Sequence, residues 1–113
     1  MKRQTLTDGS GIWFDRAAAV RFDEDTRWNG NNHISVATGS QWDHEALYYT
    51  KSGRWVLYSW SQWQGSLDTW KQVDEAAAVR WLSANNCHAD DGMDHLPESI
   101  REAVDAGLAK LEL

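Results

Sequence analysis

The chain has 113 residues and a formal net charge of −6, with 42% apolar and 25% charged residues. This composition excludes a disordered chain and is typical of one globular domain. The single cysteine, Cys87, excludes an internal disulfide framework, and no run approaches the roughly 18 apolar residues of a membrane span. The N-terminus leads into no apolar run, so we expect no signal peptide and a cytoplasmic protein.

The first third of the chain predicts a hairpin followed by a short helix. Extended runs at 4–7 and 12–14 flank Asp8-Gly9-Ser10-Gly11, which is a turn sequence. Asp15 is placed to cap a helix from Arg16 to about Glu24. Three consecutive acids, 23–25, have the wrong sign for a helix C-terminus, so we expect this helix to be short.

The middle of the chain predicts antiparallel strands. Asn29-Gly30 is the strongest turn signal, and it precedes an alternating strand at 33–38. Further strands at 45–50 and 54–62 are joined by a tight turn at Gly53. Because side chains alternate, the 54–62 strand carries large rings on both faces, which favours a central strand covered on both sides.

The last third predicts one more strand and two helices. The strand at 69–73 ends at Asp74, which caps a helix from Glu75 to about Asn85. A polar loop covers 86–97, and Pro97 introduces a C-terminal amphipathic helix over 98–112. The segment Phe14–Phe22 matches Val73–Trp81, 59 positions on, and we interpret the match as one structural solution used twice.

The predicted fold class is therefore α+β. It has a small antiparallel β-sheet of about four or five strands, two short Asp-capped helices and the C-terminal helix. We expect a single domain over 1–113, with a Trp-rich core at 1–85. Most of the eight tryptophans are expected in that core, because each buried ring hides a large area. Covering the Trp-rich strand on both sides predicts a homodimer.

Candidate catalytic and metal sites in the sequence are weak. The segment from Cys87 to His95 collects Cys, His and Asp, but it matches neither a zinc-finger nor a calcium-loop spacing, so we expect a polar linker and no cofactor. His44 and Glu45 are adjacent on a strand and would point to opposite faces, although His33 could approach either across the sheet. We therefore expect that the protein is not an enzyme.

The uneven distribution of acidic residues predicts a basic binding partner. Residues 1–85 hold ten acids and nine bases, whereas 86–113 hold seven acids and two bases. We expect this acidic end to bind a basic protein surface, such as that of a nucleic-acid-binding protein, and not nucleic acid itself. The predicted partner-binding residues are the acids and two tryptophans beside polar turns: Asp90, Asp91, Asp94, Glu98, Glu102, Asp105, Trp63 and Trp28.

In size and charge alone the chain is similar to small acidic inhibitors such as anti-CRISPR proteins and antitoxins, and no motif supports that likeness. It implies an inhibitor or regulator. Two alternatives remain open. One is a module that binds a small ligand or carbohydrate through Trp28, Trp42, Trp60 and Trp63. The other is a small metal-dependent hydrolase built on His33, His44, His88 or His95.

Overall fold

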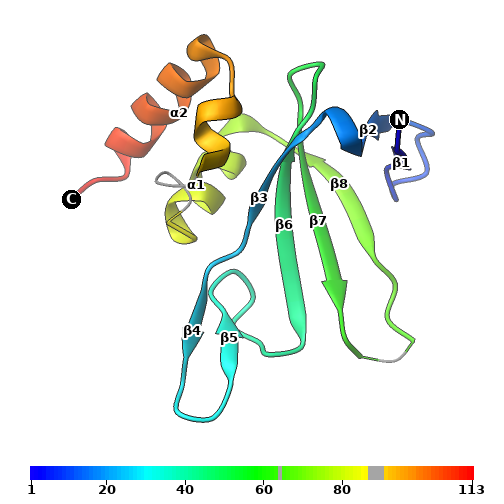
Figure 1. The fold of residues 1–113 in the computed structure, drawn as a ribbon, viewed down its shortest axis with the longest axis vertical. Helices are drawn as coiled ribbons and strands as arrows, with labels where there is room; N and C mark the ends of the chain where they lie inside the picture. The colour runs from blue at the N-terminus through cyan, green and yellow to red at the C-terminus, as the bar shows by residue number, and fades with distance from the viewer. Residues whose placement is uncertain (64, 87–90) are drawn as a thin grey trace.

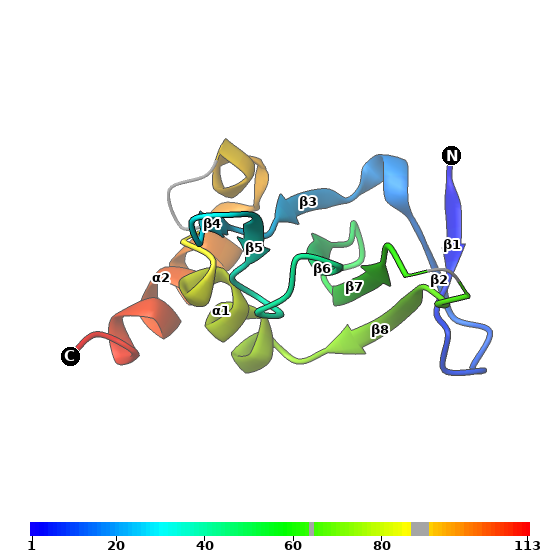
Figure 2. The ribbon, with the colours of Figure 1, turned by 90° about the horizontal axis from the view of Figure 1, so that it is seen from below.

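The computed structural model describes residues 1–63, 65–86 and 91–113. Its architecture is α+β, as predicted, in three layers (Figures 1 and 2). Two helices lie on one side of a four-stranded antiparallel sheet of order β3-β6-β7-β8, and an N-terminal hairpin lies on the other. The strands are β1 Arg3–Thr5, β2 Trp13–Asp15, β3 Val20–Asp23, β4 Thr26–Trp28, β5 His33–Ser35, β6 Asp43–Tyr49, β7 Trp55–Ser61 and β8 Thr69–Val73. The α-helices are α1 Glu75–Ala84 and α2 Glu98–Lys110, and short 3-10 helices cover Arg16–Ala18 and Asp91–His95.

The β6–β7 hairpin forms the centre of the sheet. Gly53 takes a positive φ of 86° in its turn, and the Thr50 N–H donates to the Arg54 carbonyl at 2.8 Å. The register then places Tyr49 opposite Trp55, with ring centroids 4.8 Å apart. The prediction that β7 is a central strand is confirmed, because β6 and β8 pair with its two edges.

Each face of this sheet has its own apolar core. On the helix side, Phe22, Leu47 and Trp55 pack with Leu82 and Val104. On the hairpin side, the buried residues are Leu6, Phe14, Ala46, Tyr48, Val56 and Trp70. The chain itself therefore covers both faces of β7, which removes the premise of the predicted homodimer; the dimer itself stays a prediction.

The predicted first helix is wrong beyond its opening turn. Asp15 does act as a cap, since its Oδ1 accepts the Ala17 N–H at 3.0 Å, but only the 3-10 helix follows. Residues 20–23 then form β3, which places Val20 opposite Tyr49 and Phe22 opposite Leu47 in β6. Alternation in this segment buries Phe22 in the core, and pairing with β6 outweighs the helix propensity of the alanines.

The matching segment at 73–81 does form a helix. The Asp74 carboxylate accepts the Ala77 N–H at 2.7 Å, and α1 buries Ala78, Val79 and Leu82. The interpretation of one solution used twice is therefore wrong, although both copies share a strand end and an Asp cap. The predicted C-terminal helix is confirmed as α2, with Val104 fully buried.

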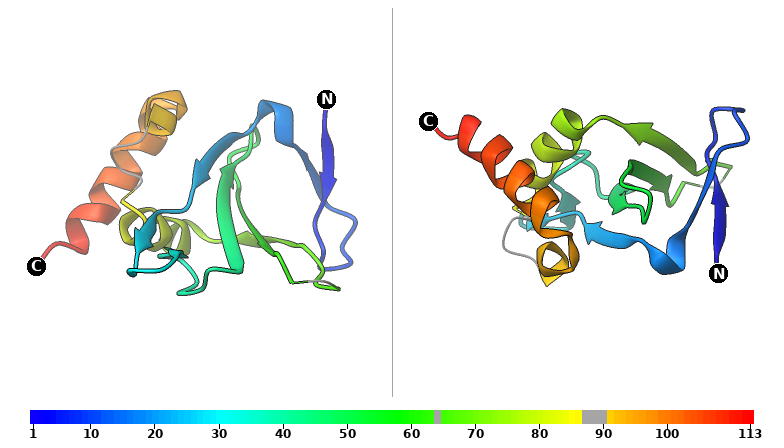
Figure 3. Two further views of the ribbon diagram at one scale, coloured as in Figure 1. Left: turned by 60° about the horizontal axis from the view of Figure 1, so that its bottom comes forward. Right: turned by 90° about the horizontal axis from the view of Figure 1, so that it is seen from above.

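The β4–β5 hairpin is a separate two-stranded sheet that extends beside the far end of β6 (Figures 1 and 3). The strand predicted over 33–38 ends at Ser35. There the Ser35 Oγ accepts the Thr38 N–H and the Ser35 carbonyl accepts the Gly39 N–H, so the chain turns. Within the described residues, no helix is long and apolar enough to cross a membrane.

Candidate functional site

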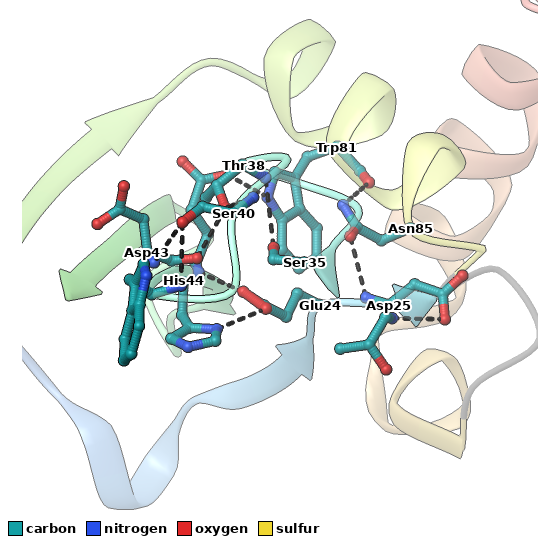
Figure 4. A network of polar contacts seen from close by, with 12 residues as sticks. Glu24, Asp25, Ser35, Thr38, Ser40, Asp43, His44, Trp81 and Asn85 are labelled. Atoms are coloured by element: carbon teal, nitrogen blue, oxygen red, sulfur yellow. Dashed lines mark hydrogen bonds and ion pairs between the residues drawn. The ribbon is translucent and has the colours of Figure 1, made fainter. Parts of the chain in front are cut away.

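A largely buried carboxylate, that of Glu24, organises the polar contacts between the sheet and α1 (Figure 4). Its side chain is only 9% exposed. One carboxylate oxygen lies 2.9 Å from His44 Nδ1, and the other accepts the Glu45 backbone N–H at 2.6 Å. Glu45 in turn accepts the indole N–H of Trp81 at 3.1 Å. This chain of contacts fixes the start of β6 against α1.

A second link joins the same elements. Asn85, at the C-terminal end of α1, accepts the Asp25 backbone N–H at 3.0 Å and donates its amide to the Trp81 carbonyl at 2.9 Å. Asn86 adds a contact from its amide to the Asp25 carboxylate at 3.1 Å. Because a buried amide is costly to leave unpaired, these bonds hold the β3–β4 connection on the helix.

Two of the described histidines, His33 and His44, lie against different tryptophans. His44 and Glu45 point apart, as expected, and the ring of His44 packs against Trp60 at 5.5 Å. Among the described residues, His44 Nε2 is buried without a hydrogen-bond partner and Nδ1 contacts Glu24, so neither ring nitrogen of His44 contacts a hydroxyl or a thiol. His33 lies in β5 against Trp28, with centroids 5.1 Å apart.

No metal centre is apparent in the described part of the chain, where no three His, Cys, Asp or Glu side chains gather as ligands. Of the predicted cluster, Cys87, His88 and Asp90 lie outside the described residues. His95 is exposed at the end of its 3-10 helix.

An exposed pair of tryptophans marks the far end of the sheet. Trp42 precedes β6 and Trp63 follows β7, and the Gln62 N–H donates to the Trp42 carbonyl to extend the ladder between them. Their ring centroids are 5.2 Å apart, yet the residues are 40% and 60% exposed. Leu67, in the same β7–β8 loop, is 88% exposed. Neither ring belongs to the apolar cores, so the pair forms an exposed apolar surface at this end of the sheet.

A groove of about 370 Å³ lies at the same end of the sheet, and its lining includes Trp60 and Leu67 as well as polar side chains. Asp43 pairs with Ser61, and Glu45 pairs with Ser59, so these side chains share the helix-side face of the sheet beyond the end of α1. Hydroxyl groups add to the lining at Thr38, Ser66 and Thr69, and none of the described lining residues is a lysine or arginine.

The opposite face at this end carries a stack of rings. Tyr58 lies between Trp60 and Trp70, at 4.7 and 3.9 Å between centroids. Burial, together with a 2.7 Å hydrogen bond to Asp68, raises the pKa of Tyr58 to about 12. The Arg21 guanidinium lies 5.8 Å from the Trp60 ring centre. This face is therefore filled by the chain's own groups.

The structure separates the predicted partner residues into distant sets. The acids Asp94, Glu98, Glu102 and Asp105 are exposed on α2 and just before it. In Figure 1, α2 lies at the opposite end of the molecule from the tip of the β4–β5 hairpin, where β4 ends at Trp28, and from the β7–β8 loop, which carries Trp63. Asp90 lies outside the described residues, and for Asp91 the structure describes only the backbone.

The surface position of Trp28 and Trp63 is confirmed, since each is 60% exposed. The core prediction for the tryptophans holds for the buried Trp55 and Trp70 and, in part, for the half-buried Trp60 and Trp81. Trp13 and Trp42 are exposed, at 45% and 40%.

Sequence reasoning missed Glu24. It stands within three consecutive acids that suggested the end of a helix, so its burial is visible only once β3 is known to pair with β6. The contact of Trp42 with Trp63 has a usable signal, because both flank strands joined by a tight turn. Comparison with protein-family models, with curated proteins and with solved structures finds no match for this chain.

Proposed function

We propose that the protein is a non-enzymatic interaction module that binds a basic protein surface, with Trp42 and Trp63 as its anchor. The observation that carries the proposal is the exposed ring pair at the sheet end. Tryptophan is enriched among residues that dominate binding energy, and large exposed apolar side chains that pack on each other mark interaction surfaces.

The charge around this anchor supports a basic partner. Asp43 directly follows Trp42, and Asp68 lies in the loop that carries Trp63; both are exposed. The acids of α2 add to a net charge of −6 and would attract the same partner at longer range. Such steering needs no direct contact with α2, which fits the separation of α2 from the β7–β8 loop in Figure 1.

The type of partner follows from the same charges. In a cell, strongly basic protein surfaces commonly hold nucleic acid, so an acidic module that covers one acts as an inhibitor or regulator. We place this activity in the cytoplasm.

The test is affinity capture from a lysate of the source organism, with the wild-type chain and with Trp63→Ser and Trp28→Ser variants. Both tryptophans are equally exposed, so Trp28→Ser is the matched control. We expect a stoichiometric basic partner that is released by salt and is lost with Trp63→Ser but kept with Trp28→Ser. Capture that is indifferent to Trp63 and to salt would overturn the proposal.

A further inference from the structure

A groove of about 460 Å³ opens between α1 and α2. The buried Val79 lines it, and Gly107 packs so closely on this side chain that a Cβ would lie 2.9 Å from Val79 Cγ1. Ala76 and Ala106 also line the groove, and both are exposed. Because alanine side chains are short, a further helix laid on this groove would approach the backbones of α1 and α2 closely.

The two helices run in the same general direction along the groove. At the start of α1, Glu75 shares a cavity with Ile100, which lies in the first turn of α2. Further along the helices, Val79 meets Gly107. Positions late in α1 and late in α2 therefore lie at the same end of the groove.

The two ends of the groove carry opposite charges. Glu75 lines the end where α1 begins, whereas Arg80 and Lys110 line the other end. Glu75 and Arg80 are five residues apart, which is about 7.5 Å along the helix axis. All three residues are exposed, and within the described residues none of them takes part in an ion pair. The groove therefore presents both signs of charge, at separate places, to whatever covers it.

We infer that this groove is the interface of a homodimer. The two copies pack their helices antiparallel about a two-fold axis, so that Glu75 of each copy meets Arg80 of the other. In such an interface every contact occurs twice, so one acid and one base per chain give two ion pairs. Leu111, which is 46% exposed and lines the basic end, is covered as well.

This inference places the predicted homodimer on the helices and not on the Trp-rich strand. It goes beyond the proposed function, because α2 and the β7–β8 loop lie at opposite ends of the molecule (Figure 1). The two surfaces are therefore free to act independently.

A second copy fits the charges of the groove better than other occupants do. A reversed copy brings a base to Glu75 and an acid to Arg80, whereas a small anion would satisfy the basic end alone. A strongly basic partner would meet Arg80 and Lys110 as like charges, which is unfavourable. Each copy has a net charge of −6, so repulsion between copies opposes the pairing, and we expect the dimer at high protein concentration.

The test is sedimentation equilibrium of the full chain, from micromolar to millimolar protein, with Glu75→Lys, Arg80→Glu and the double variant. Both residues are exposed, so the substitutions leave the core intact. Glu98→Lys is the matched control. Glu98 is an exposed acid in the first turn of α2, as Glu75 is in that of α1, but it does not line the groove.

We expect the wild type and Glu98→Lys to dimerise equally. Each single groove variant should dimerise at least about tenfold more weakly, because two equivalent ion pairs become two like-charge contacts. The double variant should regain the dimer. An equimolar mixture of Glu75→Lys and Arg80→Glu should form a heterodimer, since both contacts between the two variants join opposite charges.

A wild type that stays monomeric throughout would leave the groove to an anion or to another protein and would overturn the inference. Dimerisation that is equally strong in the single variants would overturn it too, as would failure of both the double variant and the mixture to restore the dimer. None of these results bears on capture of a basic partner through Trp63, which tests the proposed function separately.

Discussion

Replacing Gly107 with alanine is expected to destabilise the protein, although the same change favours most helices. Gly107 lies on α2 where that helix crosses α1. A Cβ at this position would lie 2.9 Å from Val79 Cγ1 and 3.2 Å from Cγ2. Val79 is only 5% exposed, and a β-branched side chain in a helix has essentially one rotamer, so it cannot turn away.

Two opposing free energies decide whether Gly107→Ala stabilises or destabilises the protein. Glycine to alanine in a helix gains about 0.8–1.0 kcal/mol, whereas overpacking a core costs about 1–3 kcal/mol. The expected net effect of Gly107→Ala is a loss of about 1 kcal/mol in the free energy of unfolding. In a Val79→Ala background the obstructing methyl groups are gone, and Gly107→Ala should then stabilise by about 1 kcal/mol.

The assay is urea unfolding, followed by far-ultraviolet circular dichroism, of four proteins: the wild type, Gly107→Ala, Val79→Ala and the double variant. Ala109→Gly, on the exposed side of α2, is the control and should cost about 1 kcal/mol in both backgrounds. If Gly107→Ala stabilises the wild-type chain, or has the same effect in both backgrounds, the packing argument is refuted.

Three further predictions concern the site and its supports. Glu24→Ala removes the acceptor of the partly buried Glu45 N–H and should lower the free energy of unfolding in urea by about 1–3 kcal/mol. Glu24→Gln keeps an oxygen at this place and should cost less, and equal small losses in both variants would refute the prediction. Folding raises the pKa of Tyr58 from 10.0 to about 12, so the neutral phenol contributes to the free energy of unfolding. This contribution is complete below pH 10 and is lost as pH rises toward 12. A difference titration by ultraviolet absorbance against Tyr58→Phe should show this late phenolate, and Asp68→Asn should lower its pKa; a normal titration near 10.0 would contradict the burial. Asp74→Ala should cost about 1 kcal/mol and Asp74→Ser much less, as measured by thermal unfolding, and a neutral Asp74→Ala would show that the cap is not needed.

Local signals predicted most of the strands. The turn at Gly53 and the alternating rings on either side suffice for the β6–β7 hairpin, because a turn and a period of two depend only on neighbouring residues. The same holds for α1, whose Asp74 cap and apolar spacing are both local.

The first Asp-capped segment has a structure that its local sequence does not predict. Phe14–Phe22 and Val73–Trp81 carry nearly the same residues, yet only the second is helical. What differs is the tertiary context: Val20 and Phe22 complete the edge of the sheet beside β6, a contact between distant parts of the chain that local propensity does not contain.

The candidate site was only partly predictable for the same reason. The exposure of Trp63 follows from its polar turn, and the acids of α2 follow from composition. The contact between Trp42 and Trp63, and the burial of Glu24 under the start of β6, depend on which strands pair. The arrangement at the sheet end is therefore a property of the fold and not of any one motif.

The central claim is that a basic partner docks at the Trp42–Trp63 surface. The most direct measurement is site-specific photo-crosslinking in a lysate of the source organism. A photoreactive amino acid is placed at Leu67, which is 88% exposed in the same loop as Trp63, and at Ser99 on α2 as the control. We predict one discrete adduct with a basic protein from position 67, weakened by salt and abolished by Trp63→Ser, and none from position 99. An adduct from position 99 alone, or one from position 67 that survives Trp63→Ser, would contradict the account.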